Sequence, residues 1–150
     1  MPLPTTKVFH PDWSDHHHAV AQGQMTAHGT VTRPSGVPVF NELLGYDVLP
    51  APQLLYDGLV RVQRLQPAVS ASAATIADRE LIIREYQVSL PLAVHGIDTA
   101  PIQTNDLVTV TACSDDPQLV GKVLRVRDVR LGSLVWQRDL LCEDVAQTTR

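Results

Sequence analysis

Short runs in which apolar and polar residues alternate recur along this chain, and this period of two constrains the fold more than any other feature. Alternation places every second side chain on the same face of a β-strand, which is the pattern of a half-buried sheet. The runs are Leu59–Arg64, Tyr86–Leu90, Leu107–Ala112, Val123–Val129 and Val135–Glu143. The sequence therefore predicts a mainly β fold of six or seven strands, arranged as a small antiparallel β-barrel or sandwich with long loops.

The length and composition indicate one domain with an aliphatic core. A chain of 150 residues is long enough to bury such a core and too short for two comfortable domains. Apolar residues make up 44% of the chain and aromatic residues only 5%, so Val, Leu and Ile must supply most of the buried surface. We expect residues 1–28 to form an N-terminal arm with a short helix, and residues 29–150 to form the barrel.

Prolines and glycines predict several turns in the region before the first clear alternating run. The stretch "HGTVTRPSGVPVFNE" predicts a hairpin, with a strand at Gly29–Arg33, a turn at Pro34–Gly36 and a second extended piece at Val37–Phe40. The prolines and glycine of residues 43–53 predict a loop that crosses the surface. Asp57–Gly58 indicates a turn or bulge near the start of the next strand.

Three adjacent histidines, His16–His18, raise the question of a metal site. Neighbouring residues fan out around a helix, so at most two of the three could reach one ion. We expect instead a short helix, capped by Ser14 or Asp15 and ending near Gln24, with His16, His17 and His18 on its solvated side. A zinc site would need His16 or His17 to join His10, His28 or His95 and a distant carboxylate or thiol.

No sequence pattern indicates catalysis, so the chain is not expected to be an enzyme or to carry a cofactor or metal. A nucleophile elbow, a phosphate-binding glycine loop and an HExxH helix are all missing from the sequence. The pair Asp115–Asp116 stands before a proline, which is typical of a solvated turn. A lone histidine before glycine, His95, is expected to be exposed, and Cys113 and Cys142 are expected to be buried free thiols.

Charge and hydropathy limit the partners. The formal net charge is -4 and the basic residues are dispersed, which argues against a protein that grips nucleic acid through phosphates. A mildly acidic surface would instead repel DNA within about 8 Å, the Debye length at physiological salt. No apolar run approaches the roughly 20 residues that span a bilayer, and residues 1–10 lack the apolar middle of a signal peptide. We therefore expect a protein made in a cytoplasm, with no membrane partner.

Several motifs resemble, in order and spacing, a family of small virion proteins of tailed bacteriophages of actinobacteria, the head-to-tail connector or stopper (head-closure) proteins. The matching stretches are "TVTRPSGVPVF" (Thr30–Phe40), "VSLP" (Val88–Pro91), "DLVTVTA" (Asp106–Ala112), "DDPQLVGKVLRVRDV" (Asp115–Val129) and "WQRDLLCEDV" (Trp136–Val145). Together they cover about Gly29–Val145, whereas the histidine run lies outside the similarity.

The resemblance implies a β-barrel subunit located in the virion neck, at the head–tail interface. Copies of the chain would form a ring, with the portal or adaptor ring above it and tail-terminator or tail-tube proteins below. The ring would join head to tail and help to close the channel, through which double-stranded DNA passes without sequence-specific binding. No residue-level functional site follows from it, because the matching motifs are structural.

Two segments are candidates for contact with partners. The stretch Gln66–Glu80 is long and poor in large apolar anchors, so we expect it to be a mobile loop, at least over Ala68–Ala77, that projects toward the channel or an adjacent subunit. Its candidate residues are Gln66, Ala68, Ser70, Ser72, Ala74, Ile76, Asp78, Arg79 and Glu80, and structure should resume over Arg79–Arg84. The flank Leu49–Gly58 is the second candidate, with Leu49, Pro50, Pro52 and Tyr56 as contact residues.

Other functions remain open at this point. A tail-terminator-like ring protein would share small β architecture. A barrel that binds a small apolar ligand would keep short loops and behave as a monomer. A zinc-dependent hydrolase would use the histidine run.

Overall fold

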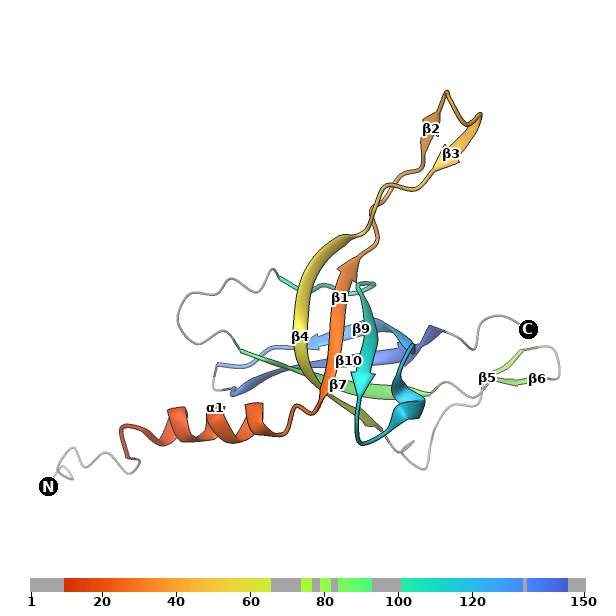
Figure 1. The fold of residues 1–150 in the computed structure, drawn as a ribbon. Helices are drawn as coiled ribbons and strands as arrows, with labels where there is room; N and C mark the ends of the chain where they lie inside the picture. Colours follow the sequence, from red (N-terminus) through yellow and green to blue (C-terminus); the bar gives the residue numbers. More distant parts are fainter. Residues whose placement is uncertain are drawn as a thin grey trace, which may run out of the picture.

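The computed structural model describes residues 10–65, 74–76, 79–81, 84–92, 101–133 and 135–145, and it confirms a mainly β fold. Six antiparallel strands close into a barrel in the order β1-β4-β7-β10-β9-β8 (Figure 1). These strands are β1 (Ala27–Arg33), β4 (Gln53–Arg64), β7 (Glu85–Pro91), β8 (Leu107–Cys113), β9 (Val123–Arg130) and β10 (Gln137–Asp144). The sheet is thus a barrel rather than a sandwich.

Alternating side chains fill the barrel interior, as the period of two requires. The core residues are Ala27, Val31, Val60, Tyr86, Val88, Leu90, Val108, Val110, Leu124, Val126, Leu140 and Cys142. Most of them have no exposed surface, and Tyr86 is the one aromatic member. The predicted aliphatic core is confirmed.

The remaining elements lie outside the barrel sheet. They are the helix α1 (Trp13–Gly23), the strand pair β2 (Val39–Asn41) and β3 (Tyr46–Val48), the strand pair β5 (Ala74–Ile76) and β6 (Arg79–Leu81), and the 3-10 helix η1 (Pro117–Leu119). In Figure 1, α1 extends from one side of the barrel, and the β2–β3 pair rises well clear of it on a two-stranded stalk.

The predicted hairpin between Gly29–Arg33 and Val37–Phe40 is wrong in its pairing. The first strand, β1, pairs with β4 along one edge and with β8 along the other, so no edge is free for the residues that follow. The second piece instead forms β2 and pairs with β3. The expected surface loop at residues 43–53 is wrong for the same reason, since Tyr46–Val48 is a strand that leaves the barrel with its partner.

The bulge predicted near the start of β4 exists, but it lies nearer the start of the strand than Asp57–Gly58. Val31 pairs with Tyr56 and the next residue of β1 pairs with Leu54, so Leu55 is the extra residue. Gly58 stands opposite Gly29 in the ladder. A Cβ on Gly29 would lie 3.1 Å from a Val60 methyl and 3.2 Å from the Thr109 carbonyl oxygen, so a larger residue there would have to displace these neighbours by a few tenths of an ångström.

The expected loop at Ala68–Ala77 contains a strand. Ala74–Ile76 pairs antiparallel with Arg79–Leu81, with Thr75 opposite Glu80. The rest of Gln66–Glu80 lies outside the described residues. Structure does resume at Arg79, as predicted.

The two thiols differ in their environment, which gives a chemical test of the core. Both Cys113 and Cys142 are free, but only Cys142 is buried, and burial raises the pKa of its thiol to about 12. Because the thiolate is the reactive form, Cys142 should not react with a disulfide reagent at pH 8 in the folded protein. We expect one reactive thiol under native conditions and two in denaturant, and equal rates for both in the folded state would contradict this packing.

Candidate functional site

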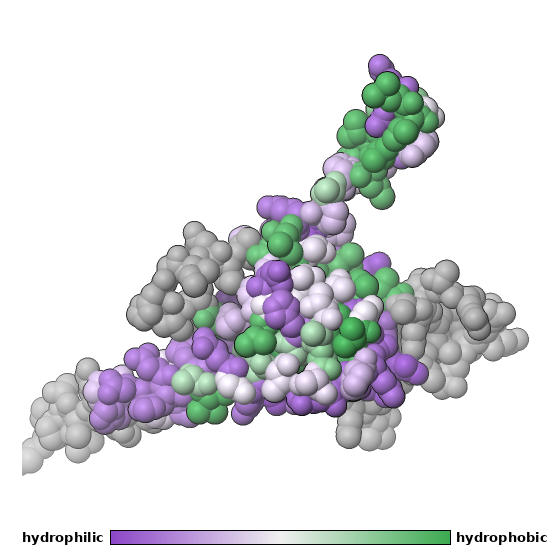
Figure 2. All heavy atoms as spheres, viewed as in Figure 1, coloured by the Kyte–Doolittle hydropathy of each residue, from purple (hydrophilic) through white to green (hydrophobic). Residues whose placement is uncertain are grey.

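The most exposed apolar structure in the described part of the chain is the segment Val37–Leu49, here called the apolar hairpin. It contains β2, β3 and their connection, and Figure 1 shows it held away from the barrel. Large apolar side chains, each more than half exposed, are Val37, Val39, Phe40, Leu43, Leu44, Tyr46 and Leu49. Leu43 at the tip is 97% exposed, and Figure 2 shows apolar residues over most of the hairpin surface.

Local chemistry shapes the apolar hairpin without help from a core. At the tip, the side-chain oxygen of Asn41 accepts hydrogen bonds from the backbone N–H groups of Leu43 (3.0 Å) and Leu44 (3.3 Å). Gly45 closes the turn with φ of +73°, a conformation that favours glycine, and its N–H donates to the Asn41 carbonyl at 2.8 Å. At the base, the Ser35 hydroxyl contacts the carbonyl oxygens on the returning chain.

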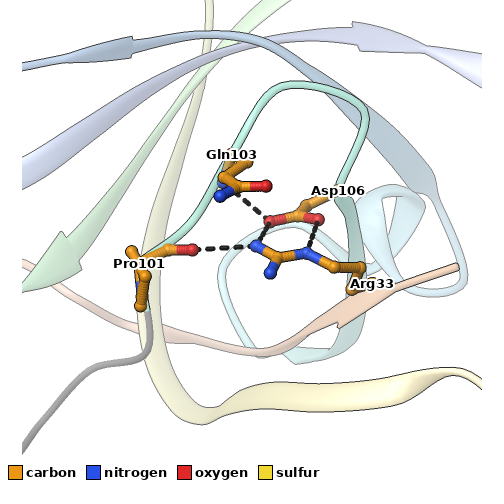
Figure 3. Close-up of polar contacts among 4 residues, drawn as sticks. All are labelled: Arg33, Pro101, Gln103 and Asp106. Atoms are coloured by element: carbon orange, nitrogen blue, oxygen red, sulfur yellow. Dashed lines mark hydrogen bonds and ion pairs between the residues drawn. The ribbon is translucent and has the colours of Figure 1, made fainter. Parts of the chain in front are cut away.

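An ion pair fixes the point where the hairpin leaves the barrel. Arg33, the last residue of β1, donates two parallel hydrogen bonds to the buried carboxylate of Asp106, both at 2.9 Å (Figure 3). The same guanidinium donates to the Pro101 carbonyl at 2.8 Å, and the Gln103 N–H donates to Asp106 at 2.8 Å. The hydrogen bond to Asp106 raises the pKa of Arg33. The arrangement ties the root of the hairpin stalk to the loop before β8.

The N-terminal helix is held against β10 by an aromatic cluster. The His17 ring stacks on Trp136 with centroids 4.7 Å apart, and Trp13 meets both rings edge-on, at 4.3 Å from His17 and 5.2 Å from Trp136. The Nδ1 atom of His18 lies 3.2 Å from the Trp136 carbonyl oxygen. The expected solvated histidine face is therefore wrong for His17 and His18, which are half-buried, and right for His16, which is exposed.

The boundaries of this helix differ at one end from the expectation. Asp12 occupies the N-cap position and makes no side-chain capping bond, whereas Ser14 and Asp15, the expected caps, lie inside the first turn. At the other end Gln24 is the C-cap, as predicted. The helix thus begins at Trp13, whose ring contacts Trp136.

A substitution of His17 tests the aromatic cluster. Both tryptophans of the chain belong to it, so His17→Ala should expose the indoles to water and move their fluorescence to longer wavelength. The barrel should keep its stability to within about 0.5 kcal/mol, because no core residue is touched. His16→Ala is the matched control on the same helix, and an equal spectral change in both variants would contradict the packing.

A hollow separates α1 from the barrel, and we call it the helix groove. It has a volume of about 360 Å³ and is lined by His17, Val20, Ala21, Gln24, Arg61, Val135, Trp136, Gln137 and Asp139. Val20 is 60% exposed there, and Arg61 donates to the Gln24 side chain at 2.7 Å. The Trp136 Nε1 atom is buried and has no hydrogen-bond partner among the described residues.

The structure brings together only part of the candidate contact set. Leu49 and Pro50 are exposed at the apolar hairpin, and Pro50 lines a hollow beneath its strands together with Phe40. Pro52 is exposed on the stalk. Tyr56 is half-buried and donates its hydroxyl to the Leu59 carbonyl of its own strand at 2.8 Å, so it is not part of the hairpin.

The second candidate segment can be placed only in part. Ala74, Ile76, Arg79 and Glu80 belong to β5 and β6, a sheet separate from the barrel. Gln66, Ala68, Ser70, Ser72 and Asp78 lie outside the described residues, as does His95. Projection of this segment toward a channel or neighbour stays a prediction.

Other titratable groups form no evident centre in the described ranges. No group of three or more histidine, cysteine or acidic residues able to hold a metal ion occurs there. Asp116 accepts a hydrogen bond from the Gln118 N–H at 3.0 Å and caps η1, while Asp115 is exposed, which confirms the predicted solvated turn. None of the described helices has the length and hydropathy needed to cross a bilayer.

The residues that make the hairpin apolar, above all Val39, Phe40, Leu43 and Leu44, were not among the predicted contact residues. Their signal is a cluster of large apolar residues around the turn "NELLGYD", in a region flanked by prolines. Such a cluster normally indicates a buried segment, and only the pairing of β1 shows that the barrel has no room for it.

The fold and its surface define the structural class of this protein, which is a closed six-stranded β-barrel with an exposed apolar hairpin. The chain belongs to the family described as "Family of unknown function (DUF6093)", which matches residues 17–143. That range includes the apolar hairpin and the barrel strands except the last residue of β10. No curated protein and no solved structure gives a significant match to this chain.

Proposed function

We propose that this protein is a structural virion protein of a tailed phage, a connector or stopper that forms a ring at the head–tail interface. The ring joins the portal or adaptor to the tail and helps to close the DNA channel. The proposal rests on the sequence resemblance over Gly29–Val145 and on the nature of the surface. The apolar hairpin is the observation that carries it.

The apolar hairpin is not expected to be favourable in an isolated monomer. Two three-residue strands make a hairpin that is marginal in water on its own. Large contiguous apolar surfaces on soluble proteins usually mark a contact with another molecule. Here the Asn41 and Gly45 turn and the Arg33–Asp106 pair hold the surface out in an ordered form, so it is ready for a partner before the partner arrives.

The barrel interior favours this reading over a ligand-binding barrel. Nine core side chains, from Val31 on β1 to Cys142 on β10, have no exposed surface, and they meet inside a barrel of only six strands. Both hollows described above lie outside the barrel, one at the apolar hairpin and one under α1. A rigid, filled barrel suits a building block that works through its outer surface.

Labelling of intact particles tests the proposal. A phage that encodes the chain would be grown with an epitope tag on it, and purified particles would be examined with gold-labelled antibody. We expect label at the head–tail joint of tailed particles. Label spread over the head or tail tube, or particles that lack the chain, would overturn the assignment.

A further inference from the structure

The apolar hairpin and the helix groove lie at opposite ends of the same pair of strands. Strand β1 begins at Ala27, next to α1, and ends at Arg33, at the root of the hairpin. Its antiparallel partner β4 returns from Gln53 at the hairpin end to Arg64 at the other, with Arg61 in the groove. Seven residues of strand span about 23 Å, and Figure 1 shows the hairpin pointing away from the barrel. The hairpin therefore cannot reach the groove of its own chain.

The two surfaces are complementary in chemistry. No lysine, arginine or histidine occurs from residue 34 to residue 60. The hairpin carries two carboxylates, Glu42 and Asp47, and neither has an ion-pair partner among the described residues. The groove offers apolar surface from Val20 and a guanidinium from Arg61.

The charge of Arg61 is available for such a contact. It donates to the neutral Gln24 side chain, and no carboxylate in the described ranges lies within ion-pair distance of it. The nearby carboxylate of Asp139 is occupied instead by hydrogen bonds from Ser89 (2.6 Å) and Gln137 (2.9 Å). Docking of an acidic, apolar segment would therefore neutralise one cation and cover the exposed apolar wall of α1.

We propose that the apolar hairpin of one copy of this chain docks in the helix groove of the next copy. This inference rests on the proposed ring and names the surfaces by which its subunits meet. Such a contact is head-to-tail: each copy uses one hairpin and one groove, and the assembly is complete only when a ring closes. Direct pairing of two hairpins is the less favourable arrangement, because it brings two surfaces of net negative charge together.

The contact also assigns a role to the histidine run. Stacking of His17 on Trp136 and the contact of His18 with the Trp136 carbonyl oxygen hold α1 beside β10. Without that attachment the groove would lose the wall that carries Val20. The run thus positions a binding surface for the neighbouring subunit.

Photo-crosslinking tests the docking directly. The full chain would be made with p-benzoylphenylalanine in place of Leu43, mixed with isotopically heavy wild-type chain and irradiated. A protein concentration of about 1 mM is used, because a contact with a binding free energy of only about 4 kcal/mol is half-formed there. We expect crosslinks between light and heavy chains at residues 13–24 or 135–139. Crosslinks mainly from hairpin to hairpin, or to any other surface, would overturn the docking, and so would their absence.

A charge exchange supplies the second arm of the test. Arg61→Glu in the heavy chain should lower the crosslink yield about threefold or more, a typical size for reversing one solvent-accessible pair. Adding Glu42→Arg and Asp47→Arg to the light chain should restore it. Arg64→Glu, on the same strand and exposed, is the matched control. A yield that is insensitive to Arg61→Glu, or that is lost equally with Arg64→Glu, would contradict the contact.

The two proposals fail in different ways. Crosslinks between copies at another surface would remove the hairpin–groove contact and leave a ring in place. Particles that lack the chain would remove the virion assignment, whatever the crosslinks show.

Discussion

Replacing Leu43 by aspartate will weaken self-association of the chain by about 100-fold or more and leave its fold intact. Burying a leucine side chain is worth about 1.5–3 kcal/mol, and a central residue of an interface can cost 2 kcal/mol or more when it is truncated. Aspartate adds the cost of desolvating a charge, and about 2.8 kcal/mol already corresponds to 100-fold in affinity. Because Leu43 is 97% exposed and touches no core residue, unfolding should change by no more than about 0.5 kcal/mol.

Sedimentation velocity over a concentration series measures this effect. Leu131 gives the matched control, since it is 79% exposed in the connection between β9 and β10 and lies outside the hairpin. Leu131→Asp removes a comparable apolar side chain and adds the same charge, and we expect it to associate like the wild type. Equal association of Leu43→Asp and wild type, or equal loss in both variants, would show that the hairpin is not the contact.

Replacing Asp106 by alanine will destabilise the protein by about 3 kcal/mol. The carboxylate is buried and accepts two hydrogen bonds from Arg33 and one from the Gln103 N–H. Hydrogen bonds to charged groups contribute about 1.5–3 kcal/mol each, and their sum is reduced here because water can reach the Arg33 side chain left behind. For a chain of this size the midpoint of thermal unfolding should fall by about 6–12 °C.

Denaturant and thermal unfolding by circular dichroism measure the loss. Asp128→Ala is the matched control, because Asp128 is an exposed carboxylate on β9 and its removal should cost no more than about 0.5 kcal/mol. A loss below about 1 kcal/mol for Asp106→Ala would mean that the ion pair does not anchor the root of the hairpin in solution.

The barrel strands could be predicted from the sequence, because the alternation of apolar and polar residues that marks a strand is a local pattern. The alternation of Val108 and Val110, and of Leu124 and Val126, predicts which side chains face inward, and all four are buried. Strand pairing is not local, and the pairing predicted for the residues after Arg33 was wrong. The short turn after Arg33 indicated a hairpin, but β1 already has β4 and β8 on its two edges, and a strand has only two edges.

The candidate site shows the same division. The prolines near Leu49 and Pro50 predicted an exposed stretch, and both residues are exposed, whereas their contact with a partner stays a prediction. The ion pair between Asp106 and Arg33 was not predicted, because it joins residues far apart in the sequence. His17 was expected in solvent because its neighbour in space, Trp136, lies far from the helix in the sequence. Contacts between residues far apart in the sequence depend on the closure of the barrel, so they can be recognised only once the fold is known.

A cryo-electron microscopy reconstruction of the neck of tailed particles that contain the chain would locate the protein and the contacts of its apolar hairpin. We expect a ring of small six-stranded barrels at the head–tail joint, in which every apolar hairpin is buried against the neighbouring copy. Barrels that lie apart from one another, with their hairpins free in solvent, would contradict it.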